Sequence, residues 1–232
     1  MTLAIVAAMR EELAAVLELM PDEHKVLVGG RDFWRGHLHG HPVIAVLSRI
    51  GKVAAATTAT VLVERFGVRE ILFTGVAGGI GAGVNVGDVV IAEAFLQHDL
   101  DVSPLFPRHE VPLYGLDRFP TDRLLTEGLA TAVRRALPQA GLHRGLVVSG
   151  DRFVSTHAEA RALRAAVPDA LAVEMEGAAI AQVCHDFGVA YAAVRTISDR
   201  ADDAAHGDFL AFIRDVASRH SAAIVEAFLA GR

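Results

Sequence analysis

The sequence has a single cysteine, Cys184, among its 232 residues. An intrachain disulfide is therefore impossible, and this is typical of a protein of the reducing cytosol. Long hydrophobic runs are lacking too, since no uncharged apolar run reaches the roughly 18 residues that a membrane span needs. The apolar stretch 3–9 has no basic region before it and is followed at once by Arg10, Glu11 and Glu12, which makes it a poor signal peptide. We therefore expect a cytoplasmic protein without a membrane span.

Positive charge is also scarce. The chain has 22 basic and 28 acidic residues, a formal net charge of -6, which argues against nucleic acid or an acidic membrane as a general partner. Hydrophobic residues make up 52% and charged residues 22% of the chain, as in globular proteins. No linker, internal repeat or low-complexity tract interrupts it. We expect one domain spanning residues 1–232.

Apolar runs alternate with segments of helical spacing along the whole chain. This alternation predicts a single-domain α/β fold, a three-layer sandwich with a central mixed β-sheet flanked by helices. One long segment, 101–120, holds four of the eight prolines and is predicted to be an irregular loop. The predicted strands are 3–9, 24–30, 33–39, 41–48, 69–74 running into a glycine turn, 88–99, 145–154, 170–175 and 189–198. The predicted helices are 11–20, 52–67, 121–137, 176–188 and 207–229.

Polar residues recur where these strands end. In open α/β sheets, ligands bind beyond the carboxyl ends of the strands. The residues there are carboxylates, a glycine-rich stretch and one aromatic ring, a content expected of a pocket for a neutral, hydroxyl-rich ring compound. They are Glu12, the stretch TGVAGG at 74–79, Phe153, Glu174-Met175-Glu176 and Ser198-Asp199.

Each of these features also has an ordinary structural interpretation. Glu12 suits the first turn of a helix, Asp199 suits an N-cap or a turn, and the two glutamates suit a helix N-terminus. TGVAGG lacks the Lys-Ser/Thr of a P-loop and the spacing of a dinucleotide-binding motif. The alternating histidines at 37, 39 and 41 suggest a metal cluster, but a hairpin turn expected at 40–42 breaks that geometry. The occurrence of all these polar residues together at strand ends nevertheless favours a ligand-binding site over separate structural roles.

The chain resembles one family through seven colinear segments: IVAAMREEL, SRIGKVAAA, TGVAGG, VGDVVIAE, GLVVSGDRFV, AVEMEGAAIAQVCHDFGV and VRTISDRAD. Together they resemble the bacterial 5′-methylthioadenosine/S-adenosylhomocysteine nucleosidases of the purine nucleoside phosphorylase superfamily. The resemblance implies a nucleoside phosphorylase-like fold and hydrolysis of the N-glycosidic bond of these adenine nucleosides in methionine salvage. It also implies a homodimer, and no metal or organic cofactor.

The resemblance assigns roles to residues whose motifs match. Glu12 would activate the attacking water and Asp199 would protonate N7 of the adenine leaving group. Glu176 would accept hydrogen bonds from the ribose hydroxyls, with Glu174 behind it as a supporting or water-holding group. The remaining substrate-binding residues would be Met175 on the sugar, Phe153 and the backbone of Val154 on the purine, Met9, Ile50 and Phe209 around the sugar and its 5′-substituent, and Val76, Gly78 and Ser198 beside them.

The sequence also departs from the family. Val76 stands where members often carry serine, and the loop at 101–120 does not align clearly with the family. In the family this region helps build the 5′-substituent pocket across a dimer interface, and Leu105 and Phe106 are the candidates for that role here. A futalosine or aminofutalosine nucleosidase on the same scaffold is therefore an alternative. A phosphorylase is another, because Arg10 and Arg49 lie close in sequence to Glu12 and Ile50, although a carboxylate at residue 12 would repel phosphate. A nucleoside-binding module without catalysis is the last alternative, and it would need neither Glu12 nor Asp199.

Overall fold

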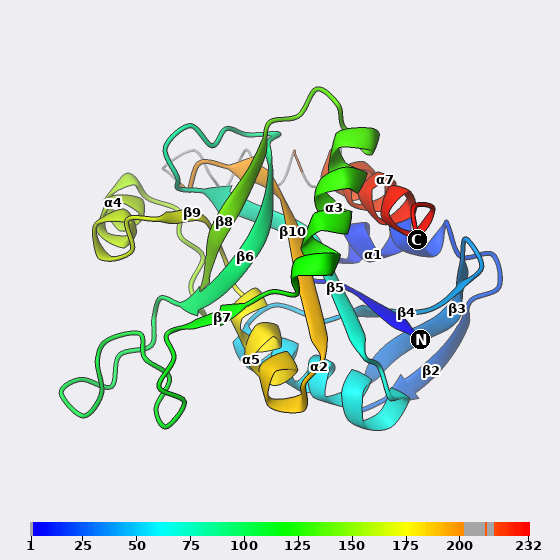
Figure 1. The fold of residues 1–232 in the computed structure, drawn as a ribbon, viewed down its shortest axis with the longest axis horizontal. Coiled ribbons are helices and arrows are strands. Elements are labelled where there is room, and N and C mark those ends of the chain that lie inside the picture. The colour runs from blue at the N-terminus through cyan, green and yellow to red at the C-terminus, as the bar shows by residue number, and fades with distance from the viewer. Residues whose placement is uncertain (1, 202–211, 213–215) are drawn as a thin grey trace.

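The computed structural model describes residues 2–201, 212 and 216–232, and in them the apolar runs form one mixed sheet with helices on both faces (Figure 1). This confirms the α/β fold predicted from the alternating pattern. The strands are β1 (Leu3–Ala7), β2 (His24–Val28), β3 (Arg31–Leu38), β4 (His41–Leu47), β5 (Glu70–Gly79), β6 (Val89–Gln97), β7 (Arg118–Pro120), β8 (Leu142–Ser149), β9 (Ala170–Glu174) and β10 (Ala190–Asp199). The helices are α1 (Arg10–Leu17), α2 (Lys52–Phe66), α3 (Arg123–Ala136), α4 (His157–Ala166), α5 (Gly177–Phe187) and α7 (Ser218–Leu229).

The sheet is partly closed on itself. Strand β10 pairs with both β5 and β6, and the path β6-β8-β9-β5 completes a ring of five strands. From β5 the sheet continues through β1, β4, β3 and β2. Strand β1 lies parallel to both β4 and β5, and all five of its residues are buried. A strand covered on both faces reads as one continuous apolar run, which is why LAIVA shows no polar alternation.

Two hydrophobic cores separate the sheet from its two helical layers. Alternate residues of β1 enter different cores, Ala4 and Val6 on one face and Leu3 and Ile5 on the other, as the two-residue period of a strand requires. The first core packs against α2 and α5, and the second against α1, α3 and α7 (Figure 1). A third cluster joins α4 to β8 and β9.

The glycine-rich end of β5 differs from the sequence prediction. We expected a glycine turn, but β5 continues through Gly79, and Gly78 pairs with Val173 of β9 and Asp199 of β10. A Cβ atom on Gly78 would lie 3.0 Å from Oδ1 of Asp199, and one on Gly79 would lie 2.9 Å from the Ile197 side chain. The glycines therefore let two strands approach the end of β5 closely, and no turn is needed there.

Two other segments add detail to the predictions. Most of 101–120 has no regular structure, as expected, but its last three residues form β7, which pairs with β6. Of the helix predicted over 207–229, the structure gives α7 from Ser218, and most of the preceding part lies outside the described residues. Within the described part of the chain, the helices are too short or too polar to cross a membrane.

Candidate active site

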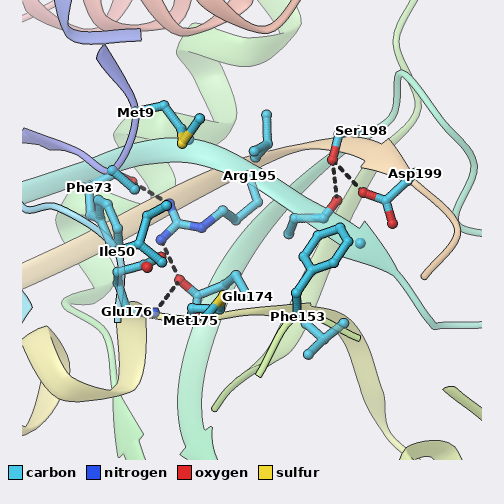
Figure 2. Close-up of a pocket in the computed structure, with 16 residues that line it drawn as sticks. Met9, Ile50, Phe73, Phe153, Glu174, Met175, Glu176, Arg195, Ser198 and Asp199 are labelled. Atoms are coloured by element: carbon cyan, nitrogen blue, oxygen red, sulfur yellow. Dashed lines mark hydrogen bonds and ion pairs between the residues drawn. The ribbon is translucent and has the colours of Figure 1, made fainter. Parts of the chain in front are cut away.

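A cavity of about 380 Å³ opens at the carboxyl ends of β5, β9 and β10 and beside the residues that follow β1. This is the sheet edge at which the sequence placed its polar residues. Figure 2 shows Met9, Ile50 and Glu176 toward one end of the cavity and Phe153 and Asp199 toward the other. The structure brings together these predicted residues in the cavity wall: Met9, Ile50, Val76, Gly78, Phe153, Glu174, Met175, Glu176, Ser198 and Asp199.

Glu12 lies directly behind this wall. It is completely buried, and its Oε2 accepts a hydrogen bond from the Met9 N–H at 3.1 Å, which caps the start of α1. Its Oε1 has no hydrogen-bond partner among the described residues. Burial raises the pKa of Glu12 to about 7, against lowering by the Met9 N–H and Arg195. The predicted first-turn role is therefore real, but it occupies only one of the two carboxylate oxygens.

Gly75 forms the part of the wall between Glu12 and the cavity. A Cβ atom on Gly75 would lie 3.4 Å from both carboxylate oxygens of Glu12 and 3.7 Å from Nη1 of Arg195. Because glycine has no side chain, the space beside Oε1 of Glu12 is not filled from this strand. At residue 75, therefore, no side chain separates Glu12 from the cavity.

The two glutamates of VEMEG have different surroundings. Glu174 accepts hydrogen bonds from the Ser149 hydroxyl, from the Gly177 N–H at 2.9 Å and from Nη2 of Arg195 at 2.9 Å. Glu176 accepts one bond, from the Gly51 N–H to its Oε1 at 2.8 Å. Burial, and then the Glu174 charge, raise the pKa of Glu176 to about 8. Glu174 is thus committed to protein donors, whereas Glu176 retains free acceptor positions toward the cavity.

Asp199 ends β10 and is almost completely buried. Its Oδ2 accepts from the Ser198 hydroxyl at 2.7 Å (Figure 2), and its Oδ1 accepts from the Ala201 N–H at 2.8 Å. Phe153, about two-fifths exposed, forms the adjoining wall, and Val154 lines a small side cavity with Phe153 and Asp199. Phe209 lies outside the described residues.

Comparison with known proteins identifies the family of the chain. The phosphorylase superfamily model matches residues 2–230. The 5′-methylthioadenosine/S-adenosylhomocysteine nucleosidase of Anoxybacillus flavithermus is 36% identical over 228 residues, 97% of each chain. The chain belongs to this nucleosidase family of the phosphorylase superfamily.

Solved structures give the same result for the fold. The nucleosidase of Neisseria meningitidis in complex with methylthio-immucillin-A superimposes with a TM-score of 0.95, at 36% identity, over 100% of this chain and 99% of that one. The futalosine hydrolase of Helicobacter pylori is similar as well, with a TM-score of 0.92 and 33% identity over 100% and 98% of the two chains. The predicted nucleoside phosphorylase-like fold is confirmed.

Among the described lining residues of this nucleosidase pocket that sequence reasoning missed, Arg195 is the charged one. Its side chain is 1% exposed, its Nη1 donates to the Phe73 carbonyl at 3.2 Å, and its guanidinium carbon lies 3.8 Å from the centre of the Phe73 ring. The available signal was a single charge inside the otherwise apolar strand AYAAVRTIS, because a buried arginine requires a partner.

The ionisable groups around the cavity are mostly acidic. Among the described residues that line it, Glu174, Glu176 and Asp199 carry carboxyl groups and Arg195 carries the one guanidinium, which is paired with Glu174. A bound anion such as phosphate would therefore meet no unpaired cation from these lining residues. A neutral ligand with hydroxyl and ring-nitrogen groups suits them better.

Proposed function

We propose that this chain releases adenine from 5′-methylthioadenosine and S-adenosylhomocysteine by hydrolysis, with Glu12 and Asp199 as its catalytic residues. One observation carries the proposal beyond family membership: a buried carboxylate, Glu12, has an oxygen without a hydrogen-bond partner beside the cavity-lining Gly75, in a site whose guanidinium is already neutralised. Such a site favours water over phosphate as the nucleophile.

The proposed roles divide the cavity in two. At the purine end, Asp199 protonates N7 as the bond to the sugar breaks, and Phe153 stacks on the base. At the sugar end, Glu176 accepts hydrogen bonds from the ribose hydroxyls and Met175 packs on the ring. The nearby carboxylates stabilise positive charge that develops on the sugar in an oxocarbenium-like transition state. A positioned acid typically contributes ~10²–10⁴ in rate.

Glu12 takes a proton from the attacking water in this mechanism. A general base is most effective when its pKa lies near the working pH, and burial raises the pKa of Glu12 to about 7. In this proposal water reaches the free Oε1 past Gly75, which has no side chain to block it. The same burial that makes this carboxylate costly to ionise therefore suits it to proton transfer at neutral pH.

The direct test is release of adenine from 5′-methylthioadenosine in phosphate-free buffer, followed by chromatography. We expect rapid release at a rate that added phosphate leaves unchanged. Release that requires phosphate and yields a sugar 1-phosphate would identify a phosphorylase and remove Glu12 from its role. Binding of an intact nucleoside without release in either buffer would identify a binding module.

Futalosine-type nucleosides are a second candidate substrate class. The observation in their favour is the similarity to the Helicobacter pylori futalosine hydrolase. The two candidates share the purine and ribose contacts and differ at the 5′-substituent, so they are separated by comparing kcat/KM for aminofutalosine and 5′-methylthioadenosine. We expect the higher value for 5′-methylthioadenosine, and the reverse order would reassign the substrate.

We also propose that the protein is a cytosolic homodimer. Leu105 and Leu113, in the loop between β6 and β7, are 79% and 92% exposed, which is unusual for large apolar side chains. Light scattering after size-exclusion chromatography tests this, with Leu105→Asp expected to shift the mass toward one chain. An unchanged monomer mass in both proteins would contradict the dimer.

A further inference from the structure

Lys52 joins three separate segments of the chain. Its Nζ donates to Oδ1 of Asp99 at 2.6 Å, and its backbone N–H donates to Oδ1 of Asp151 at 2.7 Å. The Asp151 N–H in turn donates to Oδ2 of Asp99 at 2.9 Å. These three residues form a closed ring of hydrogen bonds, the Lys52–Asp99–Asp151 cycle, between the start of α2, the residues after β6 and the residues after β8.

Pocket residues lie immediately next to the Lys52–Asp99–Asp151 cycle. Ile50 is two residues before Lys52, and Phe153 is two residues after Asp151. Between Ile50 and Lys52, the Gly51 N–H donates to Oε1 of Glu176 at 2.8 Å. The cycle therefore joins the segments that carry Ile50 and Phe153 at the two ends of the cavity, although none of its own members lines the cavity.

The charges of the cycle depend on Lys52. Its Nζ lies 2.6 Å from Asp99 and 4.0 Å from Oδ2 of Asp151, and its side chain is 16% exposed. Without the ammonium group, the carboxylates of Asp99 and Asp151 would lie close together with no cation between them. Like charges at this range repel, so the segments would separate. The backbone is also fitted closely, since a Cβ atom on Gly51 would lie 3.2 Å from Oδ1 of Asp151.

We propose that Lys52 is a positioning residue for substrate: through the Lys52–Asp99–Asp151 cycle it holds Gly51 against Glu176 and fixes the segment that carries Phe153. This inference rests on the proposed function. The three hydrogen bonds of the cycle join segments that hold the sugar and the base, and these three bonds involve neither Glu12 nor Asp199. Its loss therefore weakens substrate binding more than it slows the chemical step.

The sequence offers a matched control, because Lys25 and Lys52 are its only lysines. Lys25 forms a surface pair with Asp32 at 3.4 Å, with both side chains about half exposed. We expect Lys52→Met to raise KM for 5′-methylthioadenosine about 10-fold, the range of one charge-assisted hydrogen bond, with a much smaller change in kcat. Lys52→Arg, which retains the cation, restores most of the affinity, and Lys25→Met leaves both constants unchanged.

A double-mutant cycle separates positioning from general stabilisation. Once either partner is removed the ring is open, so Asp99→Asn and Lys52→Met together raise KM no further than either substitution alone. If Lys52→Met does not fold, Asp99→Asn alone serves as the test, and we expect the same rise in KM for 5′-methylthioadenosine. A wild-type KM in a folded Lys52→Met or Asp99→Asn protein overturns the inference, even if its free energy of unfolding has fallen.

The same series distinguishes this inference from the proposed function. Wild-type protein that releases no adenine contradicts the function, while an active wild type with an unchanged variant KM contradicts only the role of Lys52. Calorimetric binding of adenine to the same proteins supplies an affinity that needs no turnover. We expect the dissociation constant of adenine to rise in Lys52→Met, and equal constants in all the variants would also overturn the inference.

Discussion

The Nη2 atom of Arg195 lies 2.9 Å from Oε2 of Glu174, and both side chains are buried beside the active-site cavity. The pair comes from β10 and the end of β9, two strands that both pair with β5. It places a guanidinium near Glu12 while its charge is already balanced, so the cavity contains a fixed donor without attracting anions. The first carboxylate of VEMEG, Glu174, is therefore structural, whereas the second, Glu176, has acceptor positions available to a ligand.

Replacing Glu174 tests how much this pair contributes to stability. Glu174→Ala leaves Arg195 buried without a counter-charge and leaves the Ser149 hydroxyl and the Gly177 N–H without their acceptor. We expect the free energy of unfolding to fall by about 3–5 kcal/mol, measured by urea denaturation. Asp169→Ala, which breaks the exposed pair with Arg118, is the control and should cost about 1 kcal/mol or less. Equal losses in the two variants would contradict a buried, structural Glu174.

Gly75→Ala tests the route from the cavity to Glu12. The added methyl group would make ordinary contacts of 3.4 Å with the Glu12 oxygens, so the fold accommodates it. It would fill the space beside the free Oε1, and we expect turnover to fall about 10²-fold, as displacement of a reacting group does. Gly231→Ala, with a comparable 3.4 Å contact far from the cavity, should retain full activity. Wild-type turnover in Gly75→Ala would mean that water reaches the sugar elsewhere.

These features show which parts of the structure can be predicted from the sequence. The strands β1 and β5 and the site residues at their ends follow from short apolar runs and the polar groups after them. The Arg195–Glu174 pair does not, because its partners are separated by 21 residues and only the sheet brings them together. The continuation of β5 through Gly79 could not be predicted from the local sequence either. A glycine pair usually indicates a turn, and only the close approach of neighbouring strands shows that it belongs to a strand here. The closure of five strands into a ring depends on the same long-range pairing.

Asp199→Asn tests the proposed general acid. Asparagine is isosteric and can still accept from the Ala201 N–H, so the local structure should persist. An amide cannot donate its proton to the leaving base as a carboxylic acid does, and we expect turnover to fall by ~10² or more. The control is Asp186→Asn. The Asp186 carboxylate accepts a hydrogen bond from the Tyr114 hydroxyl at the surface. A folded Asp199→Asn enzyme with near-normal turnover would remove Asp199 from this role.

The raised pKa of Glu12 makes stability depend on pH in a defined direction. Burial raises this pKa from 4.5 to about 7 in the folded chain. Between these values the unfolded chain has released its proton and the folded chain still holds it, so ionisation favours unfolding as the pH rises. The contribution of Glu12 to stability is therefore complete below pH 4.5 and has been lost above pH 7.

Glu12→Gln removes this dependence, because glutamine does not ionise. The free energy of unfolding of the variant, minus that of wild type, should increase by about 2–3 kcal/mol between pH 5 and pH 8. Urea denaturation at the two pH values measures it, with the exposed Glu64→Gln on α2 as a control whose difference from wild type should not change between them. If the Glu12→Gln difference is also constant, then the carboxylate is already ionised at pH 5 and cannot be a base tuned to neutral pH. A large increase, accompanied by loss of adenine release, would tie the cost of burying Glu12 to its function.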